Sequence, residues 1–225
     1  MKNSINLTCK EEPVSVFTLI KKGEFELVKE LILDSDINVN EVDGVGNDVV
    51  TRLLKAKQYD LVIEVMKKRN WDVNHQNDEG NTFGHVLACD DSAMAVKVME
   101  CLTKKKNYIP NIKNHHGETA MDIAISNRFL CTAFKLLEDK RFNNIDVFSF
   151  KDLYNLCFNN KTYGKYTKIT NLEIIVENLE KKELNSGMQN LVDHIQDNMD
   201  AIKKDFMNNK TNILESIINH HLVTE

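Results

Sequence analysis

The sequence has little of what marks linkers, secreted domains or membrane proteins. Its 225 residues include only two prolines and eight glycines, which leaves little room for flexible linkers. No stretch approaches the roughly 18 to 20 apolar residues of a membrane-spanning helix. Residues 1–7 lack the apolar core of a signal peptide. The net charge of −5 is mild, so neither nucleic acid nor a membrane is expected as a partner.

Enzyme signatures are missing as well. The sequence has no Gly-x-x-x-x-Gly-Lys-Ser/Thr phosphate loop, no Gly-x-Gly-x-x-Gly after a strand and no Gly-x-Ser-x-Gly elbow. The adjacent pairs His115-His116 and His220-His221 would point their rings apart, unlike metal ligands spaced four residues apart on a helix. We therefore predict no catalytic residues, no metal, no cofactor and no small-molecule substrate.

The five cysteines form an odd set without a Cys-x-x-Cys pair: Cys9, Cys89, Cys101, Cys131 and Cys157. Four of them lie beside apolar residues in segments that we expect to be helical. Buried free thiols in a reducing compartment fit this pattern best. We therefore expect a cytoplasmic or nuclear protein, or one present in both compartments.

One stretch recurs along the chain. Residues 77–88 read Asn-Asp-Glu-Gly-Asn-Thr-Phe-Gly-His-Val-Leu-Ala, which predicts a β-turn followed directly by a short helix. The pattern returns 37 residues later at 114–124 and, more faintly, 34 residues earlier at 45–53. Similar segments of helical period occur at 27–32, 61–66, 95–99 and 133–137. A fixed period in the thirties predicts a repeat architecture.

This pattern resembles the ankyrin repeat. The tetrads Ile-Asn-Val-Asn at 37–40 and Trp-Asp-Val-Asn at 71–74 are similar to the family's Ala-Asp-Val-Asn, and 109–112 is a weaker copy. The family's Thr-Pro-Leu-His is never complete. The resemblance covers about residues 13–150 and implies an all-α solenoid of four to five helix-turn-helix repeats with a C-terminal helical extension. It also implies a structural role for His85, which would brace the turns.

The expected organisation follows the repeat register. Residues 1–12 are a polar lead-in, and the repeats span about 13–41, 42–75, 76–113 and 114–148. Residues 151–182 are a candidate for a divergent fifth repeat, and 183–225 form the helical extension. Glycine in the turns would supply positive φ at Gly46, Gly80 and Gly117. Thr82 and Thr119 are suited to cap the helices that follow them.

The extension contains an apolar seam with alternating gaps of four and three residues: Met188, Val192, Ile195, Met199, Ile202 and Phe206. This heptad-like spacing predicts one long helix across 188–206. Two interpretations stay open. The helix could cap the core of the last repeat, or it could bind a partner helix or a second copy of the chain. A homo-oligomer is the less favoured of these.

Two surfaces are candidate partner sites. Binding in repeat arrays uses the concave face and the turn tips, whose side chains we expect to have little structural duty. The residues of this first surface are Asp43, Arg52, Lys55, Trp71, Asn77, Asp78, Glu79, His115, His116 and Arg128. The second is a basic stripe at the carboxyl ends of successive outer helices, formed by Lys67, Lys68, Arg69, Lys104, Lys105, Lys106, Lys140 and Arg141. Cations there could instead compensate the helix dipoles.

The function that follows is non-catalytic recognition of another protein, as an adaptor or a regulatory subunit. The main alternative is an assembly protein that self-associates or binds a partner helix through residues 188–206.

Overall fold

The computed structural model of the chain describes residues 15–33, 38–68, 70–142, 145, 147–158 and 164–224. Within these ranges the regular structure is helical, and β-structure is limited to two isolated bridges, Val42–Asp48 and Gln76–Thr82. The all-α prediction is therefore confirmed. No described helix is both long and apolar enough to cross a membrane. The chain divides into two compact units, Met1–Trp71 and Asp72–Glu225.

The first unit contains α1 (Val16–Lys22), α2 (Phe25–Leu33), α3 (Val49–Lys55) and α4 (Tyr59–Met66). Helix α1 begins after Ser15, whose hydroxyl accepts the Phe17 amide, and ends at Gly23 with φ of 79°. Helix α1 packs on α2 and α3, and α3 packs on α4. Val28 and Ile32, four residues apart on α2, are buried. The helical spacing of apolar residues thus produces the core of this unit.

Trp71 belongs to that core. Its side chain is 3% exposed, and the indole Nε1–H donates to Oδ2 of Asp48 at 2.8 Å. The other oxygen of Asp48 accepts the Thr51 amide at 2.7 Å and so caps α3. Trp71 was predicted to lie on the partner-binding surface, but it is buried. The indole is held by a helix cap and therefore stabilises the first unit.

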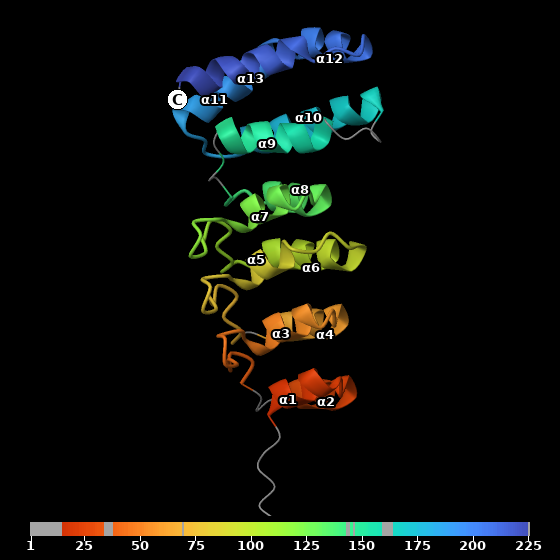
Figure 1. Cartoon of the computed structure of the whole chain (residues 1–225), viewed down its shortest axis with the longest axis vertical. Coiled ribbons are helices and arrows are strands. Elements are labelled where there is room, and N and C mark those ends of the chain that lie inside the picture. Colours follow the sequence, from red (N-terminus) through yellow and green to blue (C-terminus); the bar gives the residue numbers. More distant parts are fainter. Residues whose placement is uncertain are drawn as a thin grey trace, which may run out of the picture. The chain divides into compact units, whose positions relative to one another are not determined.

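The second unit begins with four shorter helices in two pairs (Figure 1): α5 (Phe83–Leu87) with α6 (Ala93–Thr103), and α7 (Ala120–Ser126) with α8 (Leu130–Leu137). Helix α5 packs on α7, and α6 on α8. The next pair is α9 (Val147–Phe158) with α10 (Lys165–Glu180), which packs on α7 and α8. Each pair therefore covers apolar residues of the pair before it, as expected of stacked repeats.

The turns before α5 and α7 have the backbone that the sequence predicts. Gly80 has φ of 76° and Gly117 has φ of 79°, and Gly46 in the first unit has φ of 73°. The Thr119 hydroxyl accepts the Asp122 amide at 3.3 Å, while the Asp122 carboxylate accepts from both the hydroxyl and the amide of Thr119. This reciprocal arrangement is a capping box at the start of α7.

An asparagine in each predicted tetrad, the fourth residue of the first two and the third residue of the last, bonds to backbone about one repeat later. In the first unit, Asn40 Nδ2 donates to the Asn70 carbonyl at 2.6 Å. In the second unit, Asn74 Nδ2 donates to the Asn107 carbonyl at 2.6 Å, and Asn111 Nδ2 donates to the Arg141 carbonyl at 2.9 Å. The same side chain therefore ties one repeat to the next at three places.

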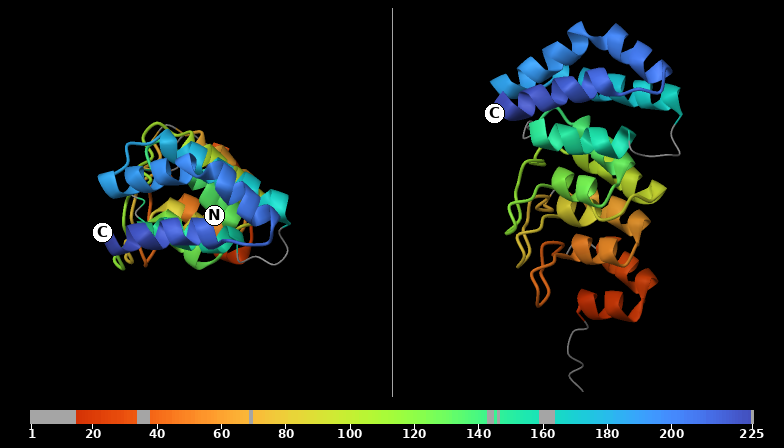
Figure 2. Two further views of the ribbon diagram at one scale, coloured as in Figure 1. Left: turned by 90° about the horizontal axis from the view of Figure 1, so that it is seen from above. Right: turned by 45° about the horizontal axis from the view of Figure 1, so that its top comes forward.

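The C-terminal part of the second unit contains α11 (Ser186–Asp197), α12 (Met199–Met207) and α13 (Asn212–Thr224), which Figure 2 shows from two further sides. The expected single helix across 188–206 is interrupted at Asn198, where φ is −109° and ψ is 8°. The break lets α11 and α12 both pack on α10 and on α13. All seam residues except the half-buried Met199 are buried within the unit.

The cysteines differ from the expectation. Cys157 is buried and Cys101 is half-buried, but the free thiols of Cys89 and Cys131 are exposed. Burial raises the pKa of Cys157 to about 12, so its thiol is protonated at neutral pH. Burial followed by the charge of Asp91 raises the pKa of Cys131 as well. Neither thiol therefore has the lowered pKa of a nucleophile. Cys9 lies outside the described residues.

Candidate functional site

The candidate site is built on two neighbouring turns of the second unit, residues 76–82 and 113–119, which project on the same side of α5 and α7 (Figure 1). The amide of His115 donates to the Glu79 carbonyl at 3.0 Å, which joins the two turns through their backbones. A Cβ on Gly80 would come within 2.6 Å of His115 Cδ2 and 2.7 Å of its amide nitrogen. The turns are thus in direct contact, and glycine is required there by space as well as by φ.

Asparagine side chains fix the shape of both turns. Asn77 Oδ1 accepts the amides of Glu79 and Asn81 at 3.0 Å. Asn114 Oδ1 accepts the equivalent amides of His116 and Glu118 at 3.0 Å. Asn114 Nδ2 donates to Oδ1 of Asn81 at 2.9 Å, which joins the two turns a second time. Asn77 was predicted to contact a partner, but it is buried and shapes its turn instead.

Gln76 Nε2 donates to the Lys113 carbonyl at 3.1 Å, and His85 of α5 adds a bond to the second turn. The Thr82 amide donates to Nδ1 of His85 at 3.1 Å, so Nδ1 carries no proton and the proton of the neutral ring sits on Nε2. Nε2 then donates to the Glu118 carbonyl at 2.9 Å. Burial lowers the pKa of His85, more than the Glu118 contact raises it. The bracing role predicted for His85 is what these contacts show, and the ring is committed to structure.

What these links leave exposed is a small group of side chains that we call the tip surface: Asp78, Glu79, His115 and His116. Glu79 Oε2 accepts from Asn81 Nδ2 at 2.9 Å, so one carboxylate is oriented by the turn below it. All four residues come from the two linked turns, so they are presented on a fixed backbone. Contact of these four residues with a partner stays a prediction.

The candidate residues of the first unit form most of their contacts within the turn that precedes α3. Asp43 Oδ1 accepts the amides of Val45 and Asn47 at 3.0 Å, and Oδ2 pairs with Arg52. Burial raises the pKa of Asp43, but the hydrogen bonds from Val45, Arg52 and Asn47 lower it below its usual value. Lys55 Nζ donates to Asn47 Oδ1 at 3.1 Å. The expectation that tip side chains have little structural duty is wrong for Asp43 and Asn77.

Arg128, the last member of the first predicted surface, lies in the loop between α7 and α8. Its side chain is exposed and its φ is 63°, in the left-handed region that non-glycine residues rarely adopt. The β-carbon, which comes close to the following carbonyl oxygen, raises the energy of this conformation by about 1–2 kcal/mol.

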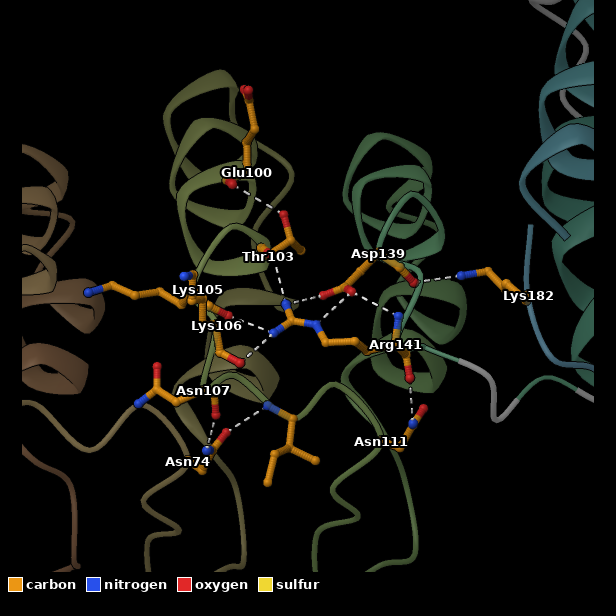
Figure 3. A network of polar contacts seen from close by, with 11 residues as sticks. Asn74, Glu100, Thr103, Lys105, Lys106, Asn107, Asn111, Asp139, Arg141 and Lys182 are labelled. Carbon is orange, nitrogen blue, oxygen red and sulfur yellow. Dashed lines mark hydrogen bonds and ion pairs between the residues drawn. The ribbon is translucent and has the colours of Figure 1, made fainter.

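The predicted basic stripe divides into residues with different roles. Arg141 donates to the carbonyls of Thr103 at 2.6 Å and of Lys105 and Lys106 at 2.6 and 3.2 Å. It also forms two bonds to the Asp139 carboxylate, at 2.9 and 2.7 Å (Figure 3). The guanidinium therefore satisfies carbonyls at the end of α6, which is the dipole-compensating role considered for the whole stripe.

The other cations of the stripe are arranged differently. Lys67 pairs with Glu64 at 2.6 Å in the first unit, and Lys104 pairs with Glu100 at 2.6 Å in the second. Lys68 is half-buried, and Arg69 lies outside the described residues. Lys106 and Lys140 are exposed. Because Lys67 and Lys68 belong to the first unit, only the residues from 104 onward can be assigned to one surface.

A buried lysine that the sequence did not indicate completes the network around Asp139. Lys182 Nζ donates to the Asp139 carbonyl at 2.6 Å (Figure 3). The same ammonium group lies 5.7 Å from the centre of the Phe142 ring. Burial lowers the pKa of Lys182 to about 8, although Asp139 raises it. Its local sequence, Glu-Lys-Lys-Glu, is that of a solvated helix end, so no local signal marks this lysine as buried.

Two residues of the turns that were not predicted, Asn81 and Glu118, could have been found from the sequence. Asn81 and Glu118 contribute to the links between the turns, and they occupy corresponding positions, 37 residues apart, in the repeat register. Aligning the turns position by position would have paired them. In the described part of the chain, no group of three or more His, Cys, Asp or Glu is arranged to hold a metal ion.

Comparisons with known proteins bear on the fold. No protein-family model matches the sequence, and no curated protein matches it. Among solved structures, the crystal structure of EF0377, an ankyrin repeat protein, is similar with a TM-score of 0.55 at 18% sequence identity. The match covers 74% of this chain and 80% of that chain. At this identity the likeness concerns architecture alone: the chain has an all-α, ankyrin-repeat-like fold.

Proposed function

We propose that the chain is a member of the ankyrin repeat family and acts as a non-catalytic protein-interaction module. In this proposal it is an adaptor or a regulatory subunit of a larger complex, and it binds another protein through the tip surface. The working compartment is the cytosol or the nucleus, which agrees with the free and partly exposed thiols of the described cysteines.

The observation that carries the proposal is the linkage of the two turns beneath the tip surface. Three contacts join the turns directly, namely His115 to Glu79, Asn114 to Asn81 and Gln76 to Lys113, and His85 of α5 bonds to Glu118 of the second turn. A loop that is ordered before binding lowers the entropy lost when a partner binds, because its backbone loses less freedom. A pair of turns held in this way suits recognition of a folded protein surface or a peptide.

The test compares capture of partners by the parent chain and by a tip variant, Asp78→Ala with Glu79→Ala and His116→Ala. The control variant carries Lys97→Ala, Thr170→Ala and Asn190→Ala, three exposed positions on α6, α10 and α11. Far-UV circular dichroism would first confirm that all three proteins are folded. Captured proteins would then be identified by mass spectrometry and their affinities measured with purified material.

We expect a partner that binds the parent and the control variant and is lost, by about tenfold or more in affinity, with the tip variant. A partner that binds all three proteins equally would show that the tip surface is not the binding site.

Assembly through the seam has less support. The seam side chains already lie inside the second unit, where α11 and α12 pack on α10 and α13. A helix whose apolar face is covered by its own chain has little apolar area left for a second copy. No other feature of the described residues favours this alternative.

A further inference from the structure

A cleft of about 560 Å³ lies beside the ends of α6 and α8 in the second unit. Its lining is mostly charged: Glu100, Thr103, Lys104, Lys105, Lys106, Glu138, Asp139, Lys140 and Arg141. We call it the basic cleft, because five cationic side chains stand against three carboxylates. It shares no residue with the tip surface.

The three carboxylates are already neutralised by cations of the same chain. Glu100 pairs with Lys104 at 2.6 Å and Asp139 pairs with Arg141 at 2.7 Å. Glu138 pairs at 2.8 Å with Lys135, which lies outside the cleft lining. Positive charge therefore remains in the cleft after the internal pairs are counted.

Lys106 and Lys140 supply that charge on two successive repeats. Both are exposed, and neither forms an ion pair within the part of the chain that the structure describes. Half-buried Lys105 lies beside Lys106 in the same lining. An incoming carboxylate could thus meet the ammonium groups of Lys106 and Lys140 without first breaking an ion pair of either residue.

Helix carboxyl ends carry partial negative charge, which would by itself repel an anion. In the basic cleft this effect is reduced, because Arg141 covers the carbonyls of Thr103, Lys105 and Lys106. The remaining N–H groups of the guanidinium donate to both oxygens of the Asp139 carboxylate. Arg141 thus removes a repulsive surface and is itself unavailable to a ligand.

Because the donors of Arg141 are already used, the class of anion that the basic cleft can bind is restricted. Bidentate recognition of a phosphate group uses the planar fork of arginine, whereas lysine meets a phosphate as a point charge. The cleft offers lysines instead, which act as flexible point charges and suit several carboxylates spread along a segment. Charge complementarity therefore favours an acidic peptide over a phosphorylated one.

We propose that the basic cleft is a second docking site, which binds a segment of a partner protein rich in aspartate and glutamate. Lys106 and Lys140 make the principal contacts with the acidic segment, and Lys105 adds to the positive electrostatic potential of the cleft. The attraction is electrostatic, so it weakens as salt screens the charges.

The test uses the full chain and a fluorescein-labelled octaglutamate peptide, with octaglutamine as the uncharged probe. Binding would be followed by fluorescence anisotropy between about 0.05 M and about 0.3 M salt, a range over which screening rises steeply. The site variant is Lys106→Gln with Lys140→Gln. The control variant, Lys21→Gln with Lys22→Gln, removes the same charge from exposed positions at the end of α1 in the first unit.

We expect octaglutamate to bind the parent and the control variant alike, about fivefold more weakly to the site variant, and more weakly still at the higher salt. Octaglutamine should not bind. Circular dichroism and thermal unfolding of each variant would establish that the lysine changes leave the fold intact.

Three results would overturn the proposal. The first is an equal loss of octaglutamate affinity in the site and control variants, which would show that the effect comes from the net charge of the chain. The second is absence of octaglutamate binding at low salt. The third is much tighter binding of a phosphoserine peptide of the same total charge, which would assign the cleft to another class of partner. None of these results depends on the tip surface, so the two proposals can fail separately.

Discussion

The neighbouring residues Lys140 and Arg141 are equivalent in the sequence pattern and very different in the structure. Arg141→Ala removes hydrogen bonds to three carbonyls and to both oxygens of Asp139. The Asp139 side chain is only 4% exposed, so the change leaves a buried carboxylate without its cation. Breaking a buried pair from one side costs about 3–5 kcal/mol.

The Arg141 side chain, however, is 35% exposed, and water would partly screen the loss. We therefore expect Arg141→Ala to lower the free energy of unfolding by about 2–3 kcal/mol. Arg141→Lys keeps the charge but cannot reproduce the fork, so it should lose about half as much. Lys140→Ala, at an exposed position, should change the free energy by less than about 0.5 kcal/mol.

Urea-induced unfolding followed by far-UV circular dichroism would measure all three variants. The comparison at low and high salt separates the contributions, because hydrogen bonds to main-chain carbonyls depend on salt less than a surface ion pair does. A loss at Arg141→Ala no larger than that at Lys140→Ala would refute the assignment of Arg141 as the residue that closes the end of α6.

Further variants test the turns, the strained loop and the buried histidine. Gly80→Ala should destabilise the chain by about 1–2 kcal/mol more than Gly117→Ala in thermal unfolding: both have positive φ, but only a Cβ at 80 meets His115, while that at 117 has no atom within 4 Å. Arg128→Gly should raise the unfolding free energy by about 1 kcal/mol by relieving φ of 63°, and an unchanged value would argue against strain there. Because burial lowers the pKa of His85, the folded state favours the neutral ring. Its contribution to stability should be complete above about pH 6.5 and should be lost as the pH falls through the lowered folded value, a pH dependence that His85→Gln should reduce.

The repeat register is what made the helical fold predictable. The recurring turn at residues 77 and 114 predicted the glycines with positive φ and the threonine caps, because both are local properties of four to six residues. The helix pairs followed from apolar spacing, which determines the face that each helix buries. These features depend on neighbours in the sequence, and a single sequence displays such neighbours directly.

Features set by contacts between distant residues were not predictable in this way. Trp71 was assigned to a surface, but its partner Asp48 lies 23 residues away and no local pattern indicates that hydrogen bond. Arg141 and Lys182 both appear in the sequence as ordinary members of charged runs. The contacts of both side chains depend on the packing of α6, α8 and α10, which only the three-dimensional structure shows.

The break at Asn198 shares properties of both groups, the features set by local sequence and those set by distant contacts. The heptad-like spacing continues on both sides of it, so periodicity alone predicted a continuous helix. The intervening sequence Asp-Asn-Met-Asp contains no proline or glycine to mark an end. With the break, α11 and α12 both pack on α10 and α13, so tertiary packing overrides the local pattern here.

The recurrent asparagines have a consequence for how this sequence can drift. Asn40, Asn74 and Asn111 each donate to a main-chain carbonyl, so the link does not depend on which side chain the accepting residue carries. Substitutions at the accepting positions leave the donor's partner in place, and selection on the link acts on one residue instead of a matched pair. An array joined in this way can change most of its repeat sequence, one position at a time, while keeping the spacing between its repeats.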